Sequence, residues 1–256
     1  MNNLILQHHW AGFYSCCFMR LVNIIDFCIE NNEEPQTIIN NKCFTWYNPN
    51  IDKDIVPDFF KTNEKISLSY DIKINWCYSS AQFMNYIDLP LTDLYPYVEK
   101  FFSPTDKILA IKENIIEKYS IDINNSCVLF LRGNNKATEC KIPEYNEYII
   151  NANTHLKNNP DIEFIIQSDE IEFIDEMKSK FPNNIVFYDE IRTIKKNDKM
   201  TVDNNGETPE INYDYALNFL AIVLIMSECK YIICNSGNIS LWTALFRKNL
   251  ENFTQL

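Results

Sequence analysis

Arg132 is the residue whose type and position most clearly could do chemistry. It follows the apolar run Cys127 to Leu131 and precedes Gly133, and the chain has only four arginines. A guanidinium at the carboxyl end of a buried strand can hold a diphosphate through two parallel hydrogen bonds. The same position also suits a surface arginine at a strand end, and this segment alone leaves both interpretations open.

Lys136 and Glu139 stand in the loop that follows Arg132. A carboxylate beside two cations can act as a general base that takes a proton from an attacking hydroxyl. The alternative is a pair of solvated loop charges with no role in chemistry.

Polar residues also follow two further predicted strands. Ser168 and Asp169 stand between a strand and a helix, where they could cap the helix, and Asp169 could also hold a base or a ribose. The other group joins the last predicted strand to the last predicted helix and consists of Asn235, Ser236, Gly237 and Asn238. Backbone N–H groups at a helix start bind anions without net positive charge, although a plain turn fits the same residues.

Two residue pairs raise the alternative of a metal-dependent enzyme. His8 and His9 are adjacent, so on a strand they point to opposite faces and do not easily bind one metal ion. Asp52 and Asp54 imitate the Asp-x-Asp motif of metal-dependent sugar transferases, but they lie between two prolines and no strand leads into them. We therefore expect no metal site.

The composition excludes several classes of protein. The chain carries 23 Lys and Arg against 35 Asp and Glu, a net charge of −12 at pH 7, so binding to nucleic acid is not expected. Its four glycines cannot build a GxGxxG or Walker loop, so the usual dinucleotide and P-loop sites are excluded. An anionic ligand must be held by a few local groups.

The cysteines and apolar runs predict a soluble cytoplasmic protein. Nine cysteines form no CxxC pair, and their odd number favours free thiols in a reducing compartment. No signal peptide is apparent, because residues 1–10 lack a basic start and a continuous apolar stretch. The longest apolar run, near residues 217–226, is about half the length of a membrane span.

Apolar periodicity predicts the elements that would position these residues. We expect strands at 4–9, 37–39, 127–131, 162–166, 185–188 and 231–234. We expect helices at 18–29, 107–119, 144–156, 171–181 and 215–227 and from 239 onward, with a polar loop at about 193–213. This alternation predicts an α/β fold with doubly wound parallel sheets, which bind ligands at the carboxyl ends of their strands. The division between two domains is expected near Ser103 and Pro104.

The second half of the chain, over about residues 100–250, resembles the donor-binding half of the fucosyltransferase-like glycosyltransferases. This group includes α1,6-fucosyltransferases, nodulation fucosyltransferases and relatives of protein O-fucosyltransferase. The shared segments occur in the same order: Phe101-Phe102-Ser103-Pro104, Val128 to Glu139, Phe164 to Glu170, and Met226 to Ser240.

The resemblance implies a GT-B architecture, in which two Rossmann-like domains face each other across a cleft. Residues 1–103 would form the acceptor-side domain and residues 104–256 the domain that binds the nucleotide sugar. The implied activity is an inverting, metal-independent transfer of fucose or a similar sugar from a nucleotide-diphosphate donor to a hydroxyl of a glycan or other acceptor. A GDP-sugar is favoured as the donor, and no cofactor is implied.

Roles for individual residues follow from the same resemblance. Arg132 would bind the β-phosphate, Lys136 would assist the leaving diphosphate, and Glu139 would be the general base. The other donor-binding residues would be Phe130, Ser168, Asp169, Asn235, Ser236, Gly237 and Asn238. The implied acceptor side is His8, His9, Gly12 and Phe13.

Three residues depart from the family pattern. Phe130 stands in place of a histidine that helps to read guanine, Gly133 in place of a second arginine, and Asn135 in place of an aspartate. The loop to Glu139 is also one residue shorter. These departures keep open a second hypothesis, in which the chain is a catalytically inactive nucleotide- or glycan-binding module of the same fold.

Overall fold

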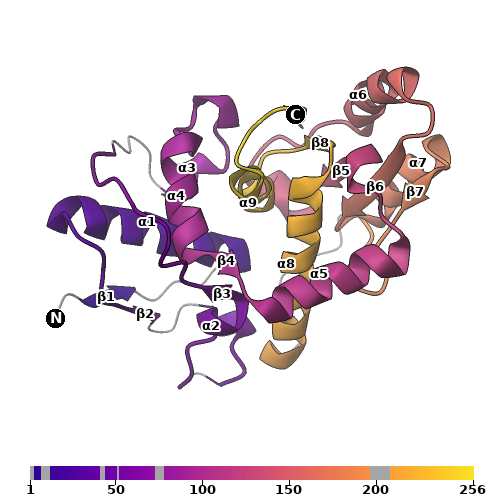
Figure 1. Ribbon diagram of the computed structural model, residues 1–256. Helices are drawn as coiled ribbons and strands as arrows, with labels where there is room; N and C mark the ends of the chain where they lie inside the picture. Colours follow the sequence, from indigo (N-terminus) through magenta and orange to yellow (C-terminus); the bar gives the residue numbers. More distant parts are fainter. Residues whose placement is uncertain (1–2, 7–11, 41–43, 51, 73–77, 197–207) are drawn as a thin grey trace.

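A five-stranded parallel sheet in the second half of the chain carries most of the candidate residues. The computed structural model describes residues 3–6, 12–40, 44–50, 52–72, 78–196 and 208–256 (Figure 1). The strand order is β7-β6-β5-β8-β9, and each neighbouring pair is parallel. The strands are β5 (Ser126–Leu131), β6 (Glu163–Ser168), β7 (Asn184–Ile185), β8 (Tyr231–Cys234) and β9 (Phe253–Gln255).

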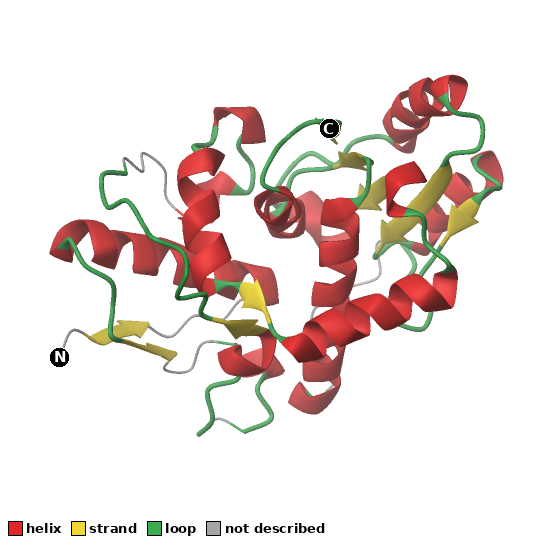
Figure 2. Cartoon of the chain, viewed as in Figure 1, coloured by secondary structure: helices red, strands yellow, loops and turns green. Residues whose placement is uncertain are grey.

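Helices cover both faces of this sheet, which explains why its central strands are apolar throughout. Cys127, Leu129 and Leu131 of β5 pack with α6 and α7, whereas Val128 and Phe130 pack with the cluster that contains α5, α8 and α9. The helices are α5 (Asp106–Tyr119), α6 (Tyr145–Asn158), α7 (Ile171–Lys180), α8 (Pro209–Glu228) and α9 (Asn238–Arg247). Figure 2 shows the helices on either side of the yellow strands.

The first half of the chain contains one long helix, α1 (Phe13–Asn31). In sequence it connects the strands β1 (Asn3–Leu6) and β2 (Thr37–Asn40), which pair with each other in parallel. The remaining elements are α2 (Val56–Phe59), β3 (Phe60–Lys61), α3 (Tyr78–Ala81), α4 (Leu91–Phe101) and β4 (Ser103–Pro104). Short 3₁₀ helices are η1 (Thr45–Tyr47), η2 (Tyr86–Asp88), η3 (Ile123–Asn125) and η4 (Asn134–Thr138). Strands β3 and β4 pair antiparallel.

The two halves share one hydrophobic core. Helix α9 lies at the centre of the molecule in Figure 1 and contacts α1, α4 and α8. The indole of Trp242 on α9 is fully buried, and its Nε1 donates a hydrogen bond to the carbonyl oxygen of Tyr14 on α1 at 3.0 Å. The predicted domain boundary falls at β4 and stays a prediction.

The predicted α/β fold with parallel sheets is confirmed, and several details of the prediction were wrong. The first predicted strand, whose apolar residues indicate a buried strand, is only partly buried: within β1 (Asn3–Leu6), Ile5 is 60% exposed. Residues 7–9 of that predicted strand lie outside the described residues. Strand β7 has only two residues, and the three-residue β9 was missed because Thr254 and Gln255 do not look like a buried strand. Helix α1 begins five residues before the expected start, at Phe13. Helix α8 begins six residues before the expected start, at Pro209, because a proline is well placed in a first helical turn.

Candidate functional site

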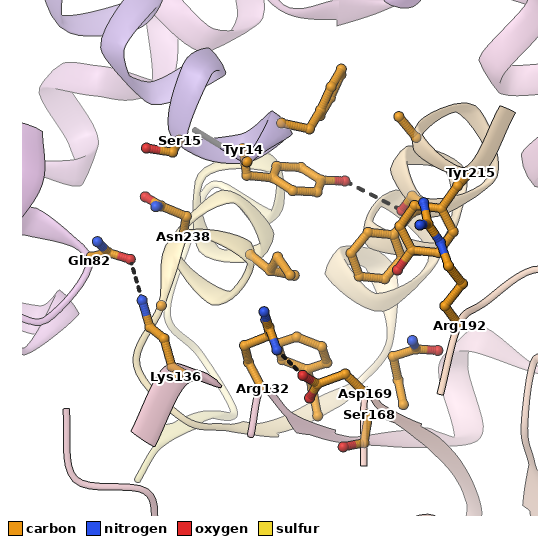
Figure 3. A pocket seen from close by; sticks show the side chains of 18 of the residues that line it. Tyr14, Ser15, Gln82, Arg132, Lys136, Ser168, Asp169, Arg192, Tyr215 and Asn238 are labelled. Carbon is orange, nitrogen blue, oxygen red and sulfur yellow. Dashed lines mark hydrogen bonds and ion pairs between the residues drawn. The ribbon is translucent and has the colours of Figure 1, made fainter. Parts of the chain in front are cut away.

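A cavity of about 540 Å³ lies at the carboxyl ends of the strands of the large sheet. Its wall comes from both halves of the chain: the start of α1, η1, the loops after β5 and β6, the first half of α8 and the start of α9 (Figure 3). The predicted residues that line it are Phe130, Arg132, Lys136, Glu139, Ser168, Asp169, Gly237, Asn238, Gly12 and Phe13. The position is the one expected for a ligand of a parallel α/β sheet.

Arg132 is held at the cavity by its backbone and by its charge. Its N–H donates to Oδ1 of Asn235 at 2.8 Å, and Nδ2 of Asn235 donates back to its carbonyl oxygen at 2.9 Å. The guanidinium forms an ion pair with Asp169, as Figure 3 shows. Burial lowers the pKa of Arg132, while the nearby Tyr215 and Glu139 act in the opposite direction. Asn235 is buried and is absent from the cavity lining, so its part is to join the ends of β5 and β8.

Two acidic side chains after β6 hold the loop that follows Arg132. Oδ1 of Asp169 accepts the N–H of Gly133 at 2.8 Å, and Oε1 of Glu170 accepts the N–H of Asn134 at 2.7 Å. Oε2 of Glu170 accepts the hydroxyl of Tyr145 at 2.6 Å. Glu170 is nearly fully buried, so this contact to the loop is made away from solvent. The loop after β5 is therefore shaped by groups of the protein before any ligand arrives.

Ser168 contributes a local turn rather than a helix cap. Its Oγ accepts the N–H of Glu170 at 3.0 Å, and α7 begins only at Ile171. The side chain is 1% exposed.

Lys136 and Glu139 form a pair at the edge of the cavity. Nζ of Lys136 donates to Oε2 of Glu139 at 2.7 Å and to Oε1 of Gln82 at 2.8 Å. The same ammonium lies 4.5 Å from the centre of the Phe83 ring. Lys136 is buried, whereas the Glu139 side chain is 45% exposed. The pair thus presents a fixed cation and an accessible carboxylate, and Gln82 ties it to the first half of the chain (Figure 3).

The start of α9 supplies a third element of the site. Gly237 has φ of 157°, a conformation that favours glycine, and a Cβ there would lie 3.6 Å from Cε of Lys136. The Tyr86 hydroxyl donates to the carbonyl oxygen of Gly237 at 2.9 Å and accepts its N–H at 3.1 Å. Gly237, Asn238 and Ile239 all line the cavity, so the positive end of the helix dipole faces it.

Ser236 is placed away from the cavity. Its Oγ accepts a hydrogen bond from Nε2 of Gln255 at 2.8 Å, and it is not among the lining residues. Its hydroxyl therefore joins the turn after β8 to β9, which was not expected from the sequence.

The remaining predicted residues divide between the cavity and other places. Gly12 and Phe13 line the cavity at the start of α1, whereas His8 and His9 lie outside the described residues. Oδ1 of Asp54 accepts the N–H of Val56 at 2.9 Å at the start of α2, and neither Asp52 nor Asp54 lines the cavity. Over the described ranges, no three His, Cys, Asp or Glu side chains are grouped as a metal site would need.

Sequence reasoning missed Arg192 and Tyr215. The Arg192 guanidinium lies 3.9 Å above the centre of the Tyr215 ring, and its Nη2 donates to Oδ1 of Asn212 at 3.0 Å. Burial lowers the pKa of Arg192 and raises that of Tyr215. Both residues line the cavity. The sequence did offer a signal for Arg192: arginine is rare in this chain, and Arg192 stands shortly after a predicted strand.

The lining is cationic although the chain is strongly acidic. Its charged side chains are Arg132, Lys136 and Arg192 against Glu139 and Asp169, in a protein with a net charge of −12. Guanidinium and ammonium groups are the usual means of holding phosphate. The cavity can therefore accept an anion in spite of the acidic surface.

Comparison with known proteins identifies the fold. No family model and no curated protein sequence matches the chain. A crystal structure of NodZ α1,6-fucosyltransferase soaked with GDP-fucose matches with a TM-score of 0.55 and 9% identity, over 96% of this chain and 92% of that chain. NodZ from Bradyrhizobium matches with a TM-score of 0.56 and 10% identity over the same shares. NodZ co-crystallized with GDP matches with a TM-score of 0.57 and 10% identity, over 96% and 91%.

At such low identity the likeness shows a common fold. The GT-B fold that the sequence segments implied is therefore confirmed, and the similarity extends over both halves of the chain. None of the described helices combines the length and the apolar character needed to cross a bilayer.

Proposed function

We propose that the cavity binds a nucleotide-diphosphate sugar and transfers its sugar to a hydroxyl of a glycan or glycoconjugate. The observation that carries this proposal is the gathering of Arg132, Lys136, Glu139 and the start of α9 around one cavity at the carboxyl edge of the sheet. The shared fold supports it, since the similar NodZ structures are described with GDP-fucose and with GDP.

The reaction is a single displacement at the anomeric carbon. The acceptor oxygen forms the new bond as the bond to the diphosphate oxygen breaks, and the configuration at that carbon inverts. Glu139 takes the proton of the acceptor hydroxyl, since its carboxylate is accessible at the cavity edge. Arg132, Lys136 and the N–H groups at the start of α9 stabilise the charge that develops on the leaving diphosphate.

The pair of Lys136 and Glu139 couples donor binding to the base. A diphosphate bound at Lys136 competes with Glu139 for the ammonium, which in the free protein donates to Oε2 at 2.7 Å. Donor binding then frees the carboxylate to face the acceptor. The proposed chemistry uses the chain's own cations and no metal ion, and a GDP-sugar is the favoured donor.

We also propose a cytoplasmic location. Seven described cysteines are free thiols, and six of them are buried. Free thiols suit a reducing compartment.

A second candidate is an inactive nucleotide- or glycan-binding module. It is favoured by Gly133, which leaves Arg132 without a second arginine beside it, and by the existing ion pair of Glu139.

Thermal shifts with GDP, UDP, TDP and CMP test the proposal, followed by donor turnover with the sugar nucleotide of the best ligand. A ligand at a hundred times its Kd stabilises the folded state by about 2.7 kcal/mol. Binding with turnover supports the transferase, and binding without turnover of donor and glycan acceptor supports the inactive module. The absence of a shift with any nucleotide contradicts the transferase and the nucleotide-binding module.

A further inference from the structure

Gln167 is a polar residue in an apolar place. It lies on β6 directly beside Phe130 of β5, in the register that also pairs Val128 with Ile165. Val128, Phe130 and Ile165 belong to the core cluster that packs under α8, and alternation along β6 puts the Gln167 side chain on that face. Gln167 is 2% exposed and lines the cavity.

The amide oxygen of Gln167 has no hydrogen-bond donor within the described part of the chain. Oε1 is buried and accepts no hydrogen bond there. Neighbouring buried polar groups do have partners, since Ser168 accepts from the backbone of Glu170, and Asn235 bonds twice to Arg132. A buried acceptor without a donor lowers stability, and an apolar side chain would fit this position without that cost. Gln167 therefore has a use other than packing.

The missing group must be a donor. Phosphate oxygens only accept hydrogen bonds from the protein, so a diphosphate cannot pair with Oε1, whereas an N–H can. Phe130, Tyr215 and Phe219 line the same cavity, and aromatic side chains of this kind can contact a flat ring.

Resting on the proposed function, we propose that Oε1 of Gln167 accepts a hydrogen bond from an N–H group of the donor's nucleobase. The terminal torsion of glutamine is soft, so the amide can turn from its buried position toward a base in the cavity. The base would lie against Phe130 and the other rings, deeper than the phosphates.

The spacing along β5 is consistent with this arrangement. Phe130 and Arg132 are two residues apart, which is about 7 Å along a strand. A base beside Phe130 and Gln167 and a diphosphate at Arg132 are thus separated by a gap that a ribose can bridge. Gln167 would then select the nucleotide, and Arg132 would hold any diphosphate.

Binding measurements by calorimetry test this assignment, with GDP, UDP, TDP, ADP and CDP as nucleotide probes and pyrophosphate as a probe without a base. Gln167→Met keeps the length of the side chain and removes the acceptor. We expect its affinity for the best nucleotide to fall about 3- to 12-fold, the worth of one hydrogen bond, while its affinity for pyrophosphate stays within about twofold of wild type.

The melting temperature of the ligand-free protein distinguishes a role of Gln167 in ligand binding from a role in holding the fold. We expect the melting temperature of ligand-free Gln167→Met to equal or exceed that of wild type, because an unpaired polar atom is removed. Gln255→Met is the matched comparison, since Gln255 bonds to Tyr86, Met84 and Ser236, and its loss should lower the melting temperature.

A measurement on the wild type keeps the test independent of the variant. Methylation of the N–H group on the preferred base should weaken binding about as much as Gln167→Met does. The proposal is overturned if the variant keeps full nucleotide affinity, if it loses pyrophosphate affinity equally, or if methylation has no effect. In each of these cases the proposed transferase function is retained if the wild type binds a nucleotide. If the wild type binds no nucleotide, both the transferase function and the role of Gln167 are overturned.

Discussion

The carboxyl group of Glu170 occupies the space where a side chain at position 133 would begin. A Cβ on Gly133 would lie 2.3 Å from both Cδ and Oε1 of Glu170, far inside van der Waals contact. Glu170 is held there by the N–H of Asn134 and the hydroxyl of Tyr145. The second arginine of the resembling family therefore has no room here while Glu170 keeps this position.

Gly133→Ala should destabilise the protein by about 1–3 kcal/mol, the usual cost of overpacking. The clash is specific to Glu170, so the same substitution should cost much less in a Glu170→Ala background. Urea unfolding of the two single variants and the double variant measures this coupling. An equal cost in both backgrounds would show that the contact does not constrain Gly133.

Arg132→Ala should weaken binding of the preferred nucleoside diphosphate by roughly 10- to 150-fold, the worth of a hydrogen bond to a charged group, and abolish transfer. Arg132→Lys should bind the nucleotide more weakly than wild type and more tightly than Arg132→Ala. It keeps the positive charge and loses the planar guanidinium that can donate two parallel hydrogen bonds. Calorimetric titration and donor turnover measure the two effects. Arg247→Ala is the control: Arg247 donates to Cys229 and Lys230 carbonyl oxygens outside the cavity, so stability should fall and nucleotide affinity should not.

Glu139→Gln should lower turnover by roughly 10² to 10⁴, because it removes the base and keeps the size. It should not weaken nucleotide binding, because the diphosphate then no longer competes with a carboxylate for the Lys136 ammonium. Steady-state kinetics with the true acceptor, alongside titration with the nucleotide, separates the two effects. Glu176→Gln, an exposed substitution on α7, should change neither. Full turnover by Glu139→Gln would assign the base to another carboxylate.

Transfer should persist in excess EDTA, since the proposed site stabilises the diphosphate with Arg132, Lys136 and the start of α9. Turnover before and after chelation, with Mn²⁺ or Mg²⁺ added back, measures this. Loss of activity that either ion restores would refute metal independence.

Glu163→Gln should slightly stabilise the protein near neutral pH, because a partly buried charge that solvent only partly screens is removed. Burial raises the pKa of Glu163 above its ordinary value of 4.5, and its Oε2 accepts no hydrogen bond from the described residues. Between the ordinary pKa of the unfolded state and the raised pKa of the folded state, the folded protein binds more protons than the unfolded chain. The free energy of unfolding of the wild type therefore falls as pH rises through this range.

Urea unfolding from pH 4 to pH 8 compares the two proteins. The variant should lose this part of the pH dependence, and the exposed Glu176→Gln should retain it. A variant whose profile matches wild type would mean that Glu163 titrates normally.

Local sequence determined the order of the elements and the polar ends of the strands. The runs Cys127 to Leu131 and Tyr231 to Cys234 are apolar at every position because helices cover both faces of the sheet. Their short length and the polar residues that follow them mark them as strands. Arg132, Lys136 and Glu139 follow from this placement, since the residues after a parallel strand stand at the ligand-binding edge.

Tertiary structure decided which distant groups meet there and which do not. Gln82 reaches Lys136 across 54 residues of sequence, and Ser236 turns to Gln255 rather than to the cavity. The clash between Glu170 and position 133 and the stacking of Arg192 on Tyr215 are likewise contacts between separate elements. The apolar periodicity of a sequence indicates only which face of a helix or strand is buried, because it arises from the local repeat of the backbone. The partner of each side chain depends on how those elements pack, and no local pattern carries that information.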